Sequence, residues 1–320
     1  MAARMTALAD KLTEYRAGIT AIDVMLTRLR DTAAHLVLDG GRAAFVDTGT
    51  ALSLPTLLAT LESKGIDRSA VDWVLTTHVH LDHAGGAGAL MRELPNARCA
   101  VHPRGARHLV DPSKLIAGSR EVFGADRYDR IYGEIVPIES SRVFVVEDGA
   151  RIRLGGRELE MIHTPGHALH HYCIVDQANA LTFSGDTFGL SYRDFDVDGR
   201  AFIFPTTTPV HFDPDALCAS VDRLMSYQPR SIFLTHYAEV TELERLACEM
   251  KERVRAFADL GLRHRKARDR ADKLRRGMFA MISGWLDEHG FPRDEGERHR
   301  LLDEDVDINC QGIEVWLDRK

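Results

Sequence analysis

The chain has 320 residues, of which 44% are hydrophobic and 28% are charged, and this composition supports a sizeable core and excludes a disordered chain. Its net charge of -7 argues against a general polyanion binder, which needs clustered positive charge. The five cysteines form no CxxC pair, and no uninterrupted apolar segment suits export or a membrane span, so we expect a cytoplasmic protein without a disulfide framework and without a membrane partner.

The chain order of apolar runs predicts a layered α/β body. The first runs, at residues 20–25, 34–39 and 43–47, predict strands, with a turn at Asp39-Gly40-Gly41. A glycine-terminated amphipathic run at 52–64 predicts a helix. The later patterns predict strands near residues 71–76, 99–101, 143–146, 159–163, 172–175, 181–184 and 231–234, and helices near 87–94 and 213–225. Two stretches, 112–132 and 189–209, have the length of pocket-covering loops.

Beyond Tyr237 the composition changes to long helical patterning. We therefore expect a catalytic domain over residues 1–239 and a mainly helical extension over 240–320, which would cap the pocket or form a homodimer contact. One run in the extension is rich in basic side chains. Interleaved acids and the lack of aromatic residues favour a solvated helix over nucleic-acid binding for this run, which comprises Arg263, Arg265, Lys266, Arg268, Arg270, Lys273, Arg275 and Arg276.

Residues of metal-ligand type crowd the segment that follows the strand at 71–76. His78 and His80, two positions apart, can point to the same side and share one metal ion. Asp82 and His83, where the chain turns towards a helix, could hold a second ion, because zinc and similar metals accept imidazole nitrogen and carboxylate oxygen. This density after a buried strand favours a metal loop over a histidine-rich surface loop.

A single loop cannot complete two coordination spheres, so further ligands should follow later strands. His167, Asp186 and His236 each come after a β-type apolar run. His163, His170 and His171 compete with His167 for the ligand role, and spacing alone does not exclude them.

These motifs resemble those of the metallo-β-lactamase superfamily, the αββα sandwich hydrolases, over roughly residues 20–240, and they are similar to the motifs of glyoxalase II. The resemblance implies a four-layer αββα fold with two divalent metal ions, zinc in the first place and iron or manganese as alternatives. A metal-bridging hydroxide would then be the nucleophile, and Asp82 could orient it as a catalytic residue. The implied ligands are His78, His80 and His167 for one ion, Asp82, His83 and His236 for the other, and Asp186 as the bridge.

Other residues are expected to support this site. Asp47 resembles the aspartate of the family's first motif, which would orient the metal loop through hydrogen bonds, although an Asx turn before Gly49 explains it as well. The aromatic stretch 187–212 could form an apolar pocket wall or anchor a long loop to the body. Tyr192 or Tyr237 could hydrogen-bond a developing oxyanion.

The leading functional hypothesis is a dinuclear metallohydrolase that acts on a small-molecule ester, lactone, thioester or amide. An iron-dependent oxidoreductase of the same fold, similar to a persulfide dioxygenase, is the main alternative, and a nuclease or phosphodiesterase is a weaker one. Phosphate-binding and dinucleotide-binding glycine motifs and the GxSxG elbow are absent, which removes the neighbouring enzyme classes.

Overall fold

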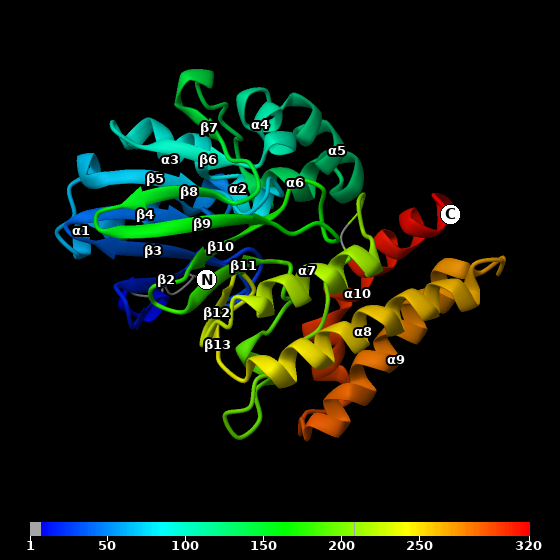
Figure 1. Ribbon diagram of the computed structural model, residues 1–320. Helices are drawn as coiled ribbons and strands as arrows, with labels where there is room; N and C mark the ends of the chain where they lie inside the picture. Colours follow the sequence, from blue (N-terminus) through cyan, green and yellow to red (C-terminus); the bar gives the residue numbers. More distant parts are fainter. Residues whose placement is uncertain (1–7, 208) are drawn as a thin grey trace, which may run out of the picture.

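Two β-sheets lie face to face in the computed structural model, and helices cover the outer side of each sheet (Figure 1). This arrangement confirms the predicted α/β class and the four-layer αββα sandwich. The structure describes residues 8–207 and 209–320. Residues 1–7 of the predicted catalytic domain and Thr208 of the predicted aromatic stretch therefore lie outside the described residues.

The first sheet has seven strands in chain order, antiparallel from β1 to β4 and parallel from β4 to β7. The strands β3 and β4 are joined by Gly40 and Gly41, whose positive φ angles of 55° and 77° suit a tight hairpin turn. The strands are β1 (Leu12–Tyr15), β2 (Ile19–Asp23), β3 (Ala33–Asp39), β4 (Arg42–Val46), β5 (Val71–Leu75), β6 (Arg98–Val101) and β7 (Val143–Val145).

The second sheet has six strands in the order β13-β12-β11-β10-β9-β8. All its neighbours are antiparallel except β11 and β12, which run parallel. The strands are β8 (Ala150–Leu154), β9 (Arg157–His163), β10 (Tyr172–Asp176), β11 (Leu181–Gly185), β12 (Ser231–Leu234) and β13 (Ala238–Val240).

Three apolar clusters hold the layers together. One lies between the sheets and joins Val46 and Leu75 of the first sheet to Phe183 and Phe233 of the second. A second cluster packs the first sheet against α1 (Leu54–Ser63), α3 (Ala87–Glu93) and α4 (Pro103–Val110). The third packs the second sheet against α7 (Pro214–Ser226), α8 (Leu243–His264), α9 (Arg270–His289) and α10 (Glu295–Asp318).

The stretch 112–132 was predicted to be a loop, and this prediction is wrong. It forms α5 (Ser113–Phe123) and α6 (Ala125–Tyr132), separated by Gly124 at φ 78°. The sequence does carry apolar residues at helical spacing here, such as Tyr128, Ile131 and Tyr132, but glycines divide the stretch into short pieces that resemble a loop. In α6, only Tyr128 and Tyr132 are buried, one turn apart.

The C-terminal helices α8, α9 and α10 are present as expected and share their apolar cluster with strands of the second sheet. Ile232 and Leu234 of β12, for instance, belong to the same cluster as Val254 and Ile313 of these helices. The boundary between residues 239 and 240 stays a prediction, and the shared core leads us to expect that the extension does not fold apart from the sandwich.

Within residues 8–207 and 209–320, no helix combines the length and apolar character that a membrane crossing requires.

Candidate metal centre

The predicted ligand residues follow the ends of strands that lie at one edge of the sandwich. His78 and His80 come after β5, and the short helix α2 (Leu81–Ala84) carries Asp82 and His83. His167, Asp186 and His236 follow β9, β11 and β12, respectively. In the second sheet β11 and β12 run parallel, and β9 runs in the same direction as β11 because both are antiparallel to β10. The three strands therefore end at one edge, and β5 of the first sheet brings its loop to the same edge of the sandwich. The structure thus gathers all seven predicted side chains around one centre.

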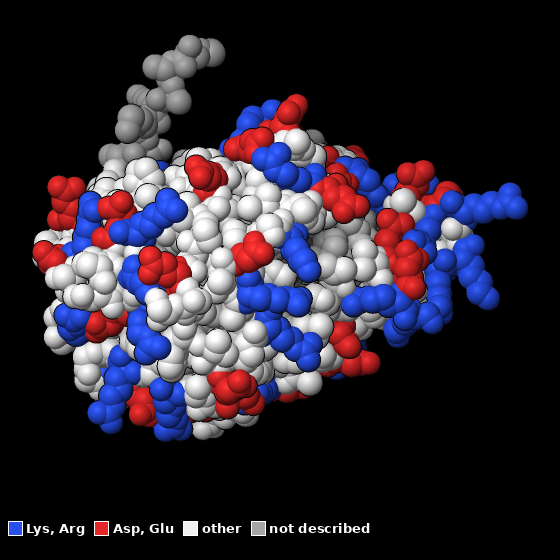
Figure 2. Space-filling model, turned by 90° about the horizontal axis from the view of Figure 1, so that it is seen from above, with Lys and Arg blue, Asp and Glu red and all other residues white. Residues whose placement is uncertain are grey.

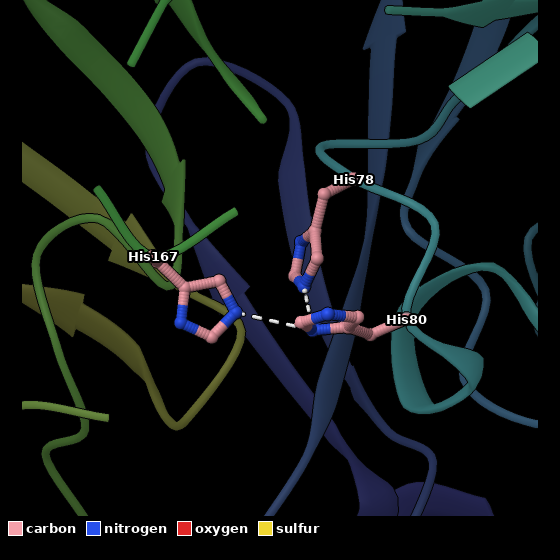
Figure 3. A group of neighbouring side chains, drawn as sticks. All are labelled: His78, His80 and His167. Carbon is pink, nitrogen blue, oxygen red and sulfur yellow. Dashed lines mark hydrogen bonds between the residues drawn. The ribbon is translucent and has the colours of Figure 1, made fainter. Parts of the chain in front are cut away.

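The first group consists of His78, His80 and His167, whose ring nitrogens converge from two loops (Figure 3). His78 Nε2 lies 2.8 Å from His80 Nδ1, and His167 Nε2 lies 3.1 Å from the same His80 atom. His78 and His167 are fully buried, whereas His80 borders the pocket. The three rings could hold one ion of the kind that imidazole ligands prefer.

The second group consists of Asp82, His83 and His236. Asp82 Oδ2 lies 3.4 Å from His83 Nε2 and 3.3 Å from His236 Nε2. Asp186 lies between the two groups, because its Oδ1 is 3.3 Å from His83 Nε2 and its Oδ2 is 3.4 Å from His167 Nε2. One carboxylate therefore faces both groups at once.

The clustered side chains cannot satisfy all their hydrogen-bonding atoms among themselves, and metal cations would fit between them. Each pair of facing imidazole nitrogens can share at most one proton, so three converging nitrogens cannot all be paired. His83 Nε2 and Asp186 Oδ1 are buried and lie 3.3 Å apart, yet neither atom forms a well-aligned hydrogen bond with any described residue. Buried polar atoms without partners are rare in folded proteins, and an ion between the groups would satisfy both.

The charges of the cluster lead to the same interpretation. Burial and the neighbouring imidazoles hold the pKa of His78 and His80 well below the usual value, so their nitrogen lone pairs are free at neutral pH. Burial would also lower the pKa of His236, but the Asp186 carboxylate and its neighbours outweigh burial and raise that pKa to about 9. The cluster thus holds protons that a bound cation would displace.

Asp47 supports the loop that carries the first histidines. Its carboxylate accepts hydrogen bonds from the backbone N–H of Thr77 at 2.8 Å and from the hydroxyl of Thr235 at 2.8 Å. Asp47 Oδ2 also lies 2.9 Å from His83 Nδ1. A proton held on Nδ1 leaves Nε2 of His83 free to face the centre. Asp47 therefore ties loops of both sheets together and is more than a local turn residue.

Two backbone carbonyls orient further rings in the same way. His236 Nδ1 lies 2.7 Å from the carbonyl oxygen of Asp31, and His167 Nδ1 lies 3.3 Å from that of Thr206. These carbonyls accept only from N–H, so each ring keeps a proton on Nδ1 and turns its Nε2 towards the cluster, where a bound cation would replace any proton on that atom. The sequence did not indicate Asp31 or Thr206, because both reach the site through long-range packing.

The competing histidines take other positions. His163 lies against His102, with ring centroids 4.1 Å apart, and faces the carbonyl oxygen of Val146. His171 accepts a hydrogen bond from the backbone N–H of Asp186 at 3.2 Å and so supports that loop. His170 lines the pocket beside the first group, with its ring 5.4 Å from that of His80.

The phenylalanines of the stretch 187–212 anchor the loop to the body and do not line the pocket. Phe188, Phe195, Phe202, Phe204 and Phe212 are all buried in the cluster that also contains the C-terminal helices. Their place in that cluster depends on α8 to α10, and the local sequence does not specify it.

The two tyrosines proposed as oxyanion donors differ in position. Tyr192 lines the pocket, but its hydroxyl donates a hydrogen bond to Asp305 at 3.1 Å. Tyr237 packs against Ala21 and Ala33 and does not line the pocket among the described residues. The expected oxyanion role therefore has no support at Tyr237, and at Tyr192 the hydroxyl is already engaged.

A pocket of about 890 Å³ opens over the metal-ligand residues His80, Asp82, Asp186 and His236. Four parts of the chain form its walls: the loop at residues 26–32, the helices α4 to α6, Thr206 with residues 209–211, and the helix α10. The C-terminal extension thus contributes directly to the pocket, as one of the two predictions for it proposed. A homodimer contact stays a prediction.

An αββα sandwich with histidines and aspartates gathered at its strand ends defines the metallo-β-lactamase fold. The chain belongs to the metallo-β-lactamase superfamily, whose family model matches residues 27–236. The resemblance drawn from the sequence is therefore confirmed.

Similar proteins agree with this family and include hydrolases. The metallo-β-lactamase fold-containing protein ST1585 of Sulfurisphaera tokodaii is 27% identical over 60% of this chain and 71% of its own. A hydroxyacylglutathione hydrolase of Acidiphilium cryptum is 32% identical over 64% of each chain. An acyl-coenzyme A thioesterase, MBLAC2 of Bos taurus, is 29% identical over 47% of this chain and 56% of its own. This chain thus spans less than two thirds of the length of the last two relatives.

Solved structures share the fold across nearly the whole chain. The structure of ST1585 has a TM-score of 0.63 at 20% identity and covers 93% of this chain and 99% of its own. The structure of TTHA1429 from Thermus thermophilus has a TM-score of 0.65 at 20% identity and covers 94% of this chain and 93% of its own. Since these matches extend beyond residues 27–236, the C-terminal helices also have counterparts in related structures.

Proposed function

We propose that the chain is a metal-dependent hydrolase that cleaves a small thioester. The observation that carries this proposal is the position of Asp186, whose two carboxylate oxygens face the two separate groups of histidines. The groups His78, His80, His167 and Asp82, His83, His236 would each hold one divalent ion, with Asp186 between them. Zinc suits this nitrogen and oxygen donor set, and iron or manganese would fit it as well.

Two divalent ions in such a site lower the pKa of water and polarise the substrate carbonyl. Hydrolysis of a thioester forms one C–O bond from water, breaks the C–S bond and returns a proton to the leaving thiolate. Asp82 borders the pocket, and its side chain is 20% exposed. Burial would raise the pKa of Asp82, but His83 and His236 hold it well below the usual value. Asp82 therefore stays a carboxylate that can accept a hydrogen bond from the attacking water and orient it.

The choice of a thioester among the predicted substrates draws on the relatives. Hydroxyacylglutathione hydrolase and acyl-coenzyme A thioesterase, the names of two similar proteins, both denote thioester cleavage. The basic run in the extension gives little support to the nuclease alternative, because Arg270, Lys273 and Arg275 form ion pairs with carboxylates. Other Lys and Arg side chains crowd the projecting end where α8 and α9 meet, away from the pocket (Figure 2).

A substrate panel tests this function. Protein of known metal content is assayed with esters, lactones, amides and thioesters that carry the same acyl group. We expect turnover of the thioester, and we expect it to stop when the metal is removed by a chelator and to return when zinc is added. Turnover that persists without metal would contradict the proposal, and oxygen uptake by an iron-loaded protein without hydrolysis would favour the oxidoreductase alternative.

A further inference from the structure

Three basic side chains line one wall of the pocket. Arg104 and Arg107 lie on α4, and Lys114 lies in the first turn of α5. All three are exposed, and none forms an ion pair with the residues that the structure describes. The nearby carboxylate of Asp111, whose pKa is lowered by hydrogen bonds from Ser113 and also by Lys114, lies outside the pocket lining. Figure 2 looks onto the face that carries α4 and α5. We call these three residues the basic wall.

The other arginines of the pocket are already paired. Arg28 forms an ion pair with Asp194 at 2.6 Å, and Arg300 forms one with Glu297 at 2.7 Å. The only acidic residue of α5 that lines the pocket is Glu121, seven positions beyond Lys114 and so about 10 Å further along the helix. The basic wall therefore keeps its positive charge available for a ligand.

The basic wall lies within reach of the metal-ligand residues. From His80 the rings step outwards to His170, at 5.4 Å between centroids, and from His170 to His108, at 6.5 Å. Arg107 Nε donates a hydrogen bond to His108 Nε2 at 3.3 Å. A substrate whose reacting carbonyl lies at the metal-ligand residues could thus reach the basic wall with an anionic group. To do so, the substrate needs a linker between its carbonyl and its anionic group.

The histidines beside the basic wall, His108 and His211, tend to stay neutral. Burial lowers the pKa of His108, and the charges of Arg107 and Lys114 lower it further. Burial likewise lowers the pKa of His211, with contributions from Arg319 and Arg104. Each of the two rings is thus affected by two nearby cations, which indicates a region of positive potential.

Apolar side chains form much of the remaining lining, beside polar and acidic residues such as Glu304 and Asp305. Leu115, Ile131 and Tyr132 line it from α5 and α6, and Ile308 and Val315 line it from α10. At its rim Leu169 and Val210 are 40% and 55% exposed. A pocket with an extended apolar lining and one basic wall fits a substrate that has an apolar acyl chain and a charged leaving group on a linker.

We propose that Arg104, Arg107 and Lys114 bind phosphate groups on the leaving thiol, so that the substrate is an acyl thioester of a phosphorylated pantetheine. This inference rests on the proposed function. Three unpaired cations suit a multiply charged phosphate better than a single carboxylate. Coenzyme A and the phosphopantetheine arm of a carrier protein share this chemistry, and the two sources are separated by experiment.

The test compares thioesters with one acyl chain and different thiols: coenzyme A, phosphopantetheine, pantetheine and glutathione. For the wild-type holoenzyme we expect kcat/KM to be at least about tenfold higher with the phosphorylated thiols than with pantetheine, mainly through KM, and to fall as salt is added. A preference for coenzyme A over phosphopantetheine would identify the free cofactor as the source, and similar values would identify the carrier arm. Equal rates with pantetheine, or faster rates with glutathione, would overturn the inference and leave the proposed hydrolase function standing.

Charge-removal variants connect the preference to the wall. In the triple variant R104A/R107A/K114A the preference for the coenzyme A thioester over the pantetheine thioester should collapse, whereas R104K/R107K should keep most of it. The matched control is Arg130→Ala, an exposed arginine of α6 that does not line the pocket. An unchanged preference in the triple variant would contradict the proposal.

A binding measurement separates this inference from the proposed function. Adenosine 3′,5′-bisphosphate carries phosphates but neither a thiol nor a thioester. Calorimetry should detect its binding to the wild-type holoenzyme and a loss of at least about tenfold in affinity in the triple variant. Binding without hydrolysis of any thioester would support the basic wall and reject the hydrolase, whereas equal binding by both proteins would reject the wall.

Discussion

At the residue scale, Asp47 connects loops that belong to different sheets. Its carboxylate accepts hydrogen bonds from Thr77 and Thr235 and holds the ring of His83. In Asp47→Asn one oxygen becomes an amide that cannot accept the His83 proton. We expect metal affinity to fall by about 10- to 100-fold, as is common for partners of ligating histidines. A competition titration with a chromophoric chelator measures this change.

The control for this variant is Asp72→Asn, which removes a carboxylate paired with Arg42 on the surface of β5. Its metal affinity should equal that of the wild type. If Asp47→Asn also retained wild-type affinity, Asp47 would have no role in orienting the metal ligands and would be a turn residue only.

Asp23 should give the fold a pH dependence that is unrelated to the metal. The residue is 1% exposed, and burial raises its pKa to about 6, although the backbone N–H groups of Arg30 and Met25 oppose this shift. The folded state therefore favours the neutral acid, and the free energy of unfolding should fall as the pH rises from about 4 to about 6. The loss should be about 2 to 3 kcal/mol, complete above that range.

The measurement is urea unfolding of the metal-free protein at several pH values, with Asp23→Asn beside the wild type. The asparagine side chain cannot ionise, so the free energy of unfolding of the variant lacks this contribution to the pH dependence. Relative to the wild type, the variant should therefore become more stable as the pH rises from 4 to 6. A constant difference over this range would show that Asp23 titrates alike in both states.

The ligand residues could be predicted from the sequence because their signal is local. His78, His80, Asp82 and His83 lie within six positions, and each distant ligand follows an apolar run. The carbonyl of Asp31 and the hydroxyl of Tyr192 could not be assigned in this way, since their partners lie more than a hundred residues away.

At the element scale, α10 connects the extension to the metal-ligand loops. Gly312 is buried against the backbone of Thr207, and an added Cβ would lie 1.4 Å from that residue's carbonyl oxygen. The preceding residue, Thr206, holds the ring of His167. We expect Gly312→Ala to reduce the free energy of unfolding by about 2 to 3 kcal/mol, because α10 must shift away from the loop.

Denaturant unfolding of the metal-free protein measures the effect, with Gly284→Ala in α9 as the matched control. A Cβ at Gly284 meets no atom within 4 Å, so alanine there should stabilise the helix by up to about 1 kcal/mol. Equal stabilities of the two variants would contradict the close contact at Gly312.

Most elements with a regular apolar pattern were predictable, but the two glycine-bounded helices α5 and α6 were not. The predicted strand at 71–76 is β5 (Val71–Leu75), which alternates little and is largely buried. The helices α5 and α6 were taken for a loop, because Gly118, Gly124 and Gly133 divide the stretch into short pieces. Their position over the pocket depends on contacts with other elements, such as the ion pair of Arg127 with Glu304 of α10.

At the scale of the whole molecule, sequence motifs identify the family and the metal-ligand residues but not the substrate. The pocket takes its walls from segments between residue 26 and residue 315, and no short motif records how these segments meet. Its basic wall comes from α4 and α5, and its apolar lining comes in part from α10. Substrate choice is therefore a property of the assembled sandwich and its C-terminal helices.

The metal content and thioester turnover of His80→Ala, measured beside the wild type, show whether the chain hydrolyses its substrate at a dinuclear metal centre. We expect two divalent ions per wild-type chain. In the variant we expect the loss of at least one ion and a decrease in turnover of at least about a hundredfold, which exceeds the usual effect of removing a hydrogen-bond partner of a ligand. His264→Ala, at the end of α8 and outside the metal groups, should match the wild type. A His80→Ala protein with both ions and full turnover would rule out this metal centre as the site of hydrolysis.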